Sequence, residues 1–320
     1  VRVVVEVEIE HAPGACDQHG GFVEHVADVG EPWRSAAGSD RDLTETADRI
    51  QRSVRCELAQ ALVVMSVTGE DQIGACLVET VNYLAPDFVI HCGDLTGHCD
   101  LANWQAGCQI LDQLDCPWYA VLGNHDTWFP GLRDAFSVRF GLPPGQGHYR
   151  RDLSGLCFLF LDLAHWHERR GGVSPYLDKE AYDAGQIAGL GPSAEGQRWL
   201  EAELADCADQ PVILVSHPPL GFKSSYLLGT LPKGKPALAS RVPVESVLGN
   251  VVGQGALRAL IGRYTNVRLA LAGHWHINDA THQDGVVYCQ TASLREFPFE
   301  VRLVEVKAGL MRVSMAPLKG

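Results

Sequence analysis

Four short polar motifs, each placed directly after an apolar run, carry the residue types that could do chemistry in this chain. Asp, Asn and His bind divalent metals through oxygen and nitrogen, and Asp and His also transfer protons. Because ligands bind at the carboxyl ends of strands in open α/β sheets, we expect the motifs to meet at one edge. This pattern predicts a metal-dependent hydrolase. The motifs are Gly93-Asp94, Gly123-Asn124-His125-Asp126, Ser216-His217-Pro218 and Gly273-His274-Trp275-His276.

The elements that must position these motifs begin near Ala61, where short apolar runs alternate with stretches of helical spacing. Such β-α-β alternation predicts a layered α/β domain. Residues 1–55 are rich in Gly, Ala, Ser and Asp, so we expect an irregular extension or insertion there and a domain over 56–320. Helices are predicted over 72–84, 101–114, 197–205 and 256–264, and strands over 62–65, 88–91, 118–122, 156–161, 212–215, 267–272, 285–290, 300–306 and 310–315.

Taken together and in this order, the four motifs resemble the calcineurin-like metallophosphoesterase family. The spacings are 30 residues from Asp94 to Asn124, 93 from there to His217 and 57 from there to His274. The similarity runs from about Ala61 to the carboxyl terminus and is closest to the bacterial branch that includes cyclic-nucleotide phosphodiesterases. The resemblance implies a four-layer α/β/β/α sandwich of two mixed sheets flanked by helices. It also implies hydrolysis of a phosphomonoester or phosphodiester by a metal-bound hydroxide.

The resemblance also implies a role for each motif residue. Asp94 would bridge two metal ions, which together neutralise the ester and activate a water. The first ion would also bind His276, and the second would bind three residues, Asn124, His217 and His274. His125 would steady the phosphate and protonate the leaving oxygen, and Asp126 would accept its other ring N–H and fix the tautomer. From the residues alone, His274 and His276 lie two apart, so on an extended segment both would face one site.

The family's opening motif, an Asp-x-His after the first strand, is missing from this chain. Val67 and Gly69 stand at the two positions, which leaves the first ion only Asp94 and His276. Three explanations stay open: other residues replace the lost ligands, a single ion is bound, or the protein is a catalytically impaired member that binds a ligand or partner. The replacement ligands considered are Glu70, Asp71, His98, Asp100 and the upstream Asp17-Gln18-His19.

A further polar run, His165-Trp166-His167-Glu168, follows Asp162 and the predicted strand 156–161. We expect Asp162 to cap the end of that strand and the histidines to be polar loop residues. An alternative is that they line the substrate cleft or hold a third metal.

Composition limits the partners. A net charge of −13 argues against binding to a nucleic-acid backbone, which needs a basic face. A small phosphate ester remains suitable, because one or two ions of manganese, iron, zinc or a similar metal would supply positive charge locally. No run approaches ~18 apolar residues, so no membrane span is expected. Oligomeric state stays open.

The number and spacing of the cysteines predict the cellular compartment of the protein. Ten cysteines without a C-x-x-C pair predict buried free thiols in a reducing cytoplasm. Cys92 and Cys99 are alternative metal neighbours.

Overall fold

The computed structural model describes residues 60–65, 71–97, 100–207, 209–220, 251–294, 299–307 and 310–318. The predicted extension over 1–55 and the positions of the missing Asp-x-His lie outside these residues. None of the helices in these ranges is long and apolar enough to cross a membrane.

The first sheet combines three parallel strands with a carboxyl-terminal hairpin. Strands β1 (Gln60–Met65), β2 (Phe88–His91) and β3 (Trp118–Ala120) run parallel. The hairpin of β13 (Glu300–Lys307) and β14 (Leu310–Pro317) pairs antiparallel with β1, which gives the order β14-β13-β1-β2-β3. The predicted strands at 62–65, 88–91, 300–306 and 310–315 are confirmed.

The second sheet has the order β11-β12-β10-β9-β5-β4. Its four inner strands are parallel: β5 (Leu156–Phe160), β9 (Val212–Val215), β10 (Val267–Ala272) and β12 (Val286–Gln290). The two edge strands, β4 (Tyr149–Leu153) and β11 (Asp279–Gln283), are antiparallel. Because buried strands of parallel sheets are apolar throughout, sequence reasoning found the inner four but missed the more polar edges.

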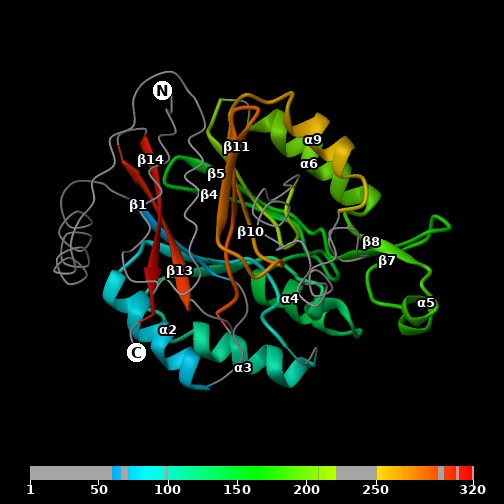
Figure 1. Ribbon diagram of the computed structural model, residues 1–320, viewed down its shortest axis with the longest axis horizontal. Coiled ribbons are helices and arrows are strands. Elements are labelled where there is room, and N and C mark those ends of the chain that lie inside the picture. The colour runs from blue at the N-terminus through cyan, green and yellow to red at the C-terminus, as the bar shows by residue number, and fades with distance from the viewer. Residues whose placement is uncertain are drawn as a thin grey trace, which may run out of the picture.

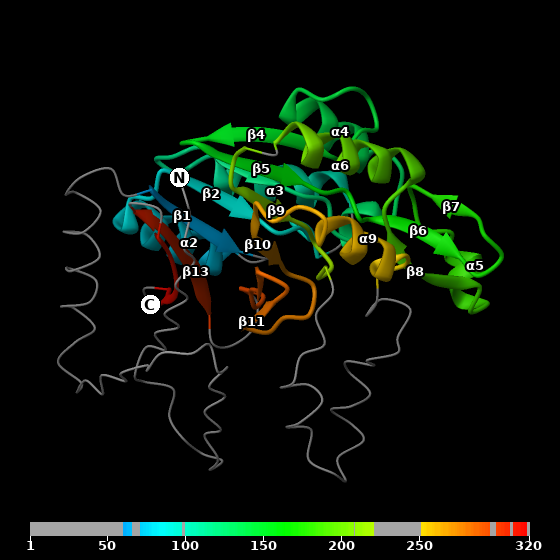
Figure 2. The ribbon, with the colours of Figure 1, turned by 90° about the horizontal axis from the view of Figure 1, so that it is seen from above.

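Helices cover the outer faces of both sheets, as Figure 1 and Figure 2 show. The first sheet carries α2 (Asp71–Leu84) and α3 (Leu101–Leu111), and the second carries α6 (Ala194–Asp206) and α9 (Gln254–Ile261). Between the sheets, Phe88 packs edge-on against Phe158 with ring centroids 5.4 Å apart. Leu200 and Leu257 belong to the separate core beneath α6 and α9. The predicted four-layer α/β/β/α sandwich is confirmed.

A third sheet of three strands, β7-β6-β8, extends to one side of the sandwich (Figure 2). It consists of β6 (His165–Glu168), β7 (Val173–Ser174) and β8 (Ile187–Gly191), with the short helix α5 (Lys179–Asp183) beside it. The prediction of a polar loop over His165–Glu168 is therefore wrong. Only Trp166 in that strand is buried, and one apolar residue is too weak a signal for a strand.

Two cysteines depart from the prediction of free thiols. Cys157 on β5 and Cys207 at the carboxyl end of α6 form a disulfide, because that end of the helix packs against the strand. The other five cysteines whose side chains the structure describes are free. They are Cys76, Cys92, Cys108, Cys116 and Cys289.

A buried ion pair joins α4 (Leu132–Phe140) to the segment after β5. The Arg133 guanidinium contacts the Asp162 carboxylate, and both side chains are 2% exposed. Arg133 also donates to the carbonyl of Ala164 at 3.2 Å. Burial tends to raise the pKa of Asp162, but Arg133 outweighs it and the pKa falls below its ordinary value. Asp162 therefore fixes the path that the chain takes into the small sheet.

Replacing Asp162 with Ala should lower the free energy of unfolding by about 3–5 kcal/mol, because Arg133 would remain buried without its counter-ion. The double variant Arg133→Met/Asp162→Leu should lose much less, as no charge is left buried. Urea unfolding at neutral pH measures both. Because the folded pKa is depressed, the contribution of Asp162 is present above its unfolded pKa of about 3.9 and disappears as the pH falls through the lower folded value. A double variant that is as unstable as Asp162→Ala, or less stable, would contradict this account.

Candidate metal centre

The predicted motifs meet where strands of the two sheets end side by side. Asp94 lies three residues beyond the end of β2, and Asn124 lies four beyond the end of β3. His217 and His274 each lie two residues beyond the end of their strands, β9 and β10. The first two residues come from one sheet and the last two from the other, so the site spans both sheets.

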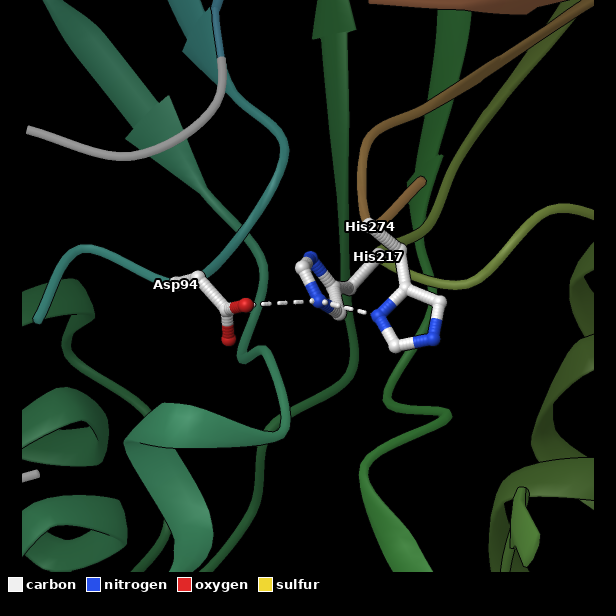
Figure 3. A group of neighbouring side chains, drawn as sticks. All are labelled: Asp94, His217 and His274. Atoms are coloured by element: carbon white, nitrogen blue, oxygen red, sulfur yellow. Dashed lines mark hydrogen bonds and ion pairs between the residues drawn. The ribbon is translucent and has the colours of Figure 1, made fainter. Parts of the chain in front are cut away.

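Three ligand-type side chains approach one atom, Nε2 of His217, and Figure 3 shows two of them, Asp94 and His274. It lies 3.1 Å from Oδ2 of Asp94, 3.0 Å from Oδ1 of Asn124 and 3.0 Å from Nδ1 of His274. One ligand atom from each of Asp94, His217 and His274 lies within 4.8 Å of the other two. The structure thus brings together four of the five predicted metal ligands.

The second ring nitrogen of His217, Nδ1, determines which nitrogen of the ring carries the proton. Nδ1 lies 2.7 Å from the carbonyl oxygen of Cys92, and a carbonyl only accepts, so Nδ1 carries the proton. Nε2 therefore faces a carboxylate, an amide oxygen and a second imidazole nitrogen. An unprotonated Nε2 would direct its lone pair at the Asp94 carboxylate, so a positive group stabilises this contact, either a second proton on His217 or a cation.

The pKa values of His217 and Asp94 shift in the directions that favour opposite charges on the two side chains. Burial lowers the pKa of His217, but the Asp94 carboxylate outweighs that effect and raises it. Burial likewise raises the pKa of Asp94, and His217 more than compensates, so the pKa falls well below its usual range.

The donor set fits a divalent transition metal. Two imidazole nitrogens, one carboxylate and one amide oxygen form a mixed nitrogen and oxygen set. A histidine that binds a metal usually donates its other N–H to a carbonyl, as His217 does to Cys92. Cys92 contributes this carbonyl, and its buried thiol is not in the described cluster of ligand atoms.

Strained backbone places two of these ligands. Asp94 has φ 59° and His274 has φ 74°, in the left-handed region that costs most residues about 1–3 kcal/mol. His276 also has positive φ, 55°, so the expected extended His-x-His is wrong. The two histidines need not face one side, and His276 is not in the described cluster of ligand atoms.

Two glycines allow the loops to approach one another. A Cβ on Gly123 would lie 2.1 Å from Oδ1 of Asp94, and one on Gly93 would lie 2.7 Å from Nδ1 of His217. Neither distance is compatible with a side chain. Both glycines are therefore required for Asp94 and His217 to occupy their positions.

The resemblance implied that Asp126 accepts the ring N–H of His125. In the structure, Asp126 accepts backbone N–H groups instead. Its Oδ2 accepts the backbone N–H groups of Asp94 at 2.9 Å and Gly123 at 2.8 Å. Its Oδ1 accepts the backbone N–H of Thr96 at 3.3 Å. Burial and the charge of Asp94 raise the pKa of Asp126 to about 6. The side chain joins the Asp94 loop to the Asn124 loop.

His125 lies in the short 3-10 helix η1 (His125–Thr127), beside the cluster. Its backbone N–H donates to Oδ1 of Asp94 at 2.8 Å, which fixes the loop next to the metal ligands. Its ring stacks on Trp128 with centroids 4.9 Å apart and planes at 21°. The residue is partly exposed.

Most of the candidate replacement ligands for the missing motif lie outside the residues that the structure describes. Asp17, His19, Glu70 and His98 lie outside the described residues, as does the side chain of Asp71. Asp100 is described and accepts the backbone N–H of Asn103 at 2.8 Å as the cap of α3.

Sequence reasoning missed His91, which ends β2 within an apolar run. It is fully buried, and neither ring nitrogen has a hydrogen-bond partner in the structure as described. Burial lowers its pKa to about 3, so the ring is neutral.

His165 and His167 belong to β6, and neither is in the metal cluster found among the described residues. Nδ1 of His165 lies 3.6 Å from Oδ1 of Asp162, and Nε2 of His167 lies 3.0 Å from the carbonyl oxygen of Pro192. The expected strand-end role of Asp162 agrees with its bond from the Ala164 N–H.

Known proteins share this architecture. A solved dimetal phosphatase from Danio rerio matches with a TM-score of 0.55 and 13% identity, over 81% of this chain and 99% of that one. GAP50 of Plasmodium, described as the anchor in the inner membrane complex, matches with a TM-score of 0.50 and 14% identity, over 82% and 85%. These identities establish likeness of fold alone.

A sequence relative is a probable glycerophosphodiester phosphodiesterase, GpdQ, from Arcobacter nitrofigilis. It is 23% identical over 209 residues, which cover 65% of this chain and 63% of the relative, slightly less than two thirds of its length. The family model for calcineurin-like phosphoesterases matches residues 25–278. Since that match covers most of the chain, the protein belongs to the calcineurin-like phosphoesterase family.

Proposed function

We propose that the protein hydrolyses a small phosphate ester with the help of a divalent metal ion held by Asp94, Asn124, His217 and His274. The observation that carries this proposal is the meeting of three ligand atoms within 3.0–3.1 Å of Nε2 of His217. These two imidazole nitrogens, one carboxylate oxygen and one amide oxygen match the ligands that transition metals prefer.

A bound ion would neutralise the charge of the phosphate and lower the pKa of a coordinated water. The chain's own residues then do the rest. The attacking water would release a proton to solvent and form a bond to phosphorus while the ester P–O bond breaks, and His125 would give its ring proton to the leaving oxygen. Because the backbone N–H of His125 donates to the Asp94 carboxylate, the residue that carries the proton donor keeps a fixed place beside the metal ligands.

The described ligands favour one ion over two. The set around His217 offers four ligands to a single ion, whereas His276 is not in the described cluster and Val67 and Gly69 have no metal-binding side chain. Manganese, iron or zinc would suit these donors.

The net charge of the chain and its sequence relative indicate the class of substrate. The net charge of −13 disfavours a nucleic acid, and the named relative is a probable phosphodiesterase, so we place a small phosphodiester first and a phosphomonoester second. A cytoplasmic location remains a prediction. The Cys157–Cys207 disulfide weighs against it, since such bonds are rare in the cytosol.

A second function is a binding module without catalysis. It is favoured by Val67 and Gly69 at the positions of two lost ligands. The fold's likeness to the Plasmodium anchor protein is consistent with it.

In an assay with bis(p-nitrophenyl) phosphate and Mn²⁺, Asp94→Asn and His217→Ala should each lower kcat/KM by about 100-fold or more, because each removes a direct ligand. The matched control is Asp284→Asn, since Asp284 has a similar φ of 54° but lies on an exposed turn. It should keep full activity. No turnover by the unaltered protein with any divalent metal, on diesters or monoesters, would instead support the binding module.

Changing Gly123 to Ala should weaken Mn²⁺ binding about 10-fold or more, because the new Cβ would displace Asp94 from its position. Gly255→Ala is the control, because a Cβ there meets nothing within 4 Å and the residue lies in α9. Isothermal titration calorimetry measures the affinity of both variants. Equal affinity in Gly123→Ala and the unaltered protein would show that Asp94 does not hold the ion.

A further inference from the structure

The His125 ring is supported on one face by Trp128, three residues along the chain. The near-parallel planes, at 21°, and the centroid distance of 4.9 Å describe a stacked pair. Stacked aromatic pairs contribute about 0.5–1.5 kcal/mol beyond the area that they bury. The contact therefore restricts the orientation of the imidazole.

Trp128 is in turn supported by the small sheet. It packs against the separate apolar cluster of Trp166, Ala181, Ile187 and Leu190. This cluster is formed entirely by residues of the excursion between β5 and α6, and none of the four motifs of the metal site contributes to it. The excursion therefore reaches the site through Trp128.

Thr127, between His125 and Trp128, is tied to the same excursion by two hydrogen bonds. The indole N–H of Trp166 donates to its hydroxyl oxygen at 3.1 Å, and the backbone N–H of Leu177 donates to its carbonyl at 3.0 Å. The turn carrying His125 is thus held by Asp94 through one set of bonds and by the small sheet through another.

The position of the Trp128 indole leaves its N–H buried without a hydrogen bond among the described residues. A buried unpaired donor costs about 1–3 kcal/mol. The Trp128 ring is therefore held by its stacking on His125 and its packing against the apolar cluster rather than by a hydrogen bond.

We propose that Trp128 is a positioning residue that orients the His125 imidazole for proton transfer to the leaving oxygen. The proposal rests on the proposed function, and it assigns the small sheet a part in catalysis. Proton donation matters most when the leaving oxygen is basic, and it contributes about 10²–10⁴-fold in rate. A displaced proton donor should therefore slow poor leaving groups selectively.

The test compares Trp128→Leu, which removes the stack, with Trp128→Phe, which keeps an aromatic face and removes the unpaired N–H. Phosphodiesters that release p-nitrophenol or unsubstituted phenol provide the good and the poor leaving group. We expect Trp128→Leu to lose about 10–100-fold in kcat with phenol and less than about 3-fold with p-nitrophenol. Trp128→Phe should stay within about 3-fold of the unaltered protein with both. Added to His125→Ala, Trp128→Leu should cause little further loss.

A second readout needs no activity. In ¹H–¹³C spectra of the metal-free protein, the indole ring current should displace the ring protons of His125 upfield. Trp128→Leu should remove that displacement and Trp128→Phe should keep most of it. Equal slowing of both esters by Trp128→Leu, or unchanged His125 shifts, would overturn the proposal. If the unaltered protein turns over no ester while the shifts respond as expected, the stack exists and the proposed function is what has failed.

Discussion

The need for positive charge at Nε2 of His217 is the constraint on which the rest of the site depends. With Nδ1 committed to the Cys92 carbonyl, this nitrogen meets a carboxylate, an amide oxygen and another imidazole at 3.0–3.1 Å. A buried carboxylate and an unprotonated ring nitrogen repel one another, unless a proton or a cation lies between them. A divalent ion meets that need with four ligands at once and makes the same atoms useful for phosphate chemistry.

Two sheets must end at the same place for these atoms to meet, and the chain is strained to bring them there. Asp94 and His274 have left-handed backbone, and Gly93 and Gly123 are small enough to let the loops approach. Asp126 holds the Asp94 and Gly123 amides together, beneath the ligands rather than among them. These contacts hold the ligand loops in place, and a site with well-held ligands gains affinity without large rearrangement.

The sequence predicts the sandwich well, because its inner strands are short apolar runs that end in the four motifs. It also predicts Asp94, Asn124, His217 and His274 as neighbours. It fails where the signal is short or depends on tertiary contacts. One buried Trp166 gives no periodicity for β6, an extended backbone is a poor guess for His274 and His276, and the disulfide joins cysteines 50 residues apart. The partners of Asp126 are backbone amides, which carry no sequence signal.

The most direct test of the central claim is a crystal structure of the protein soaked in Mn²⁺, with anomalous difference maps at the manganese edge. The account predicts an anomalous peak bonded to Asp94, Asn124, His217 and His274, with Nδ1 of His217 still on the Cys92 carbonyl. A peak elsewhere, or no peak while the four side chains keep their 3.0–3.1 Å contacts, would contradict it. In that case a proton on His217, rather than a metal, would hold the cluster together.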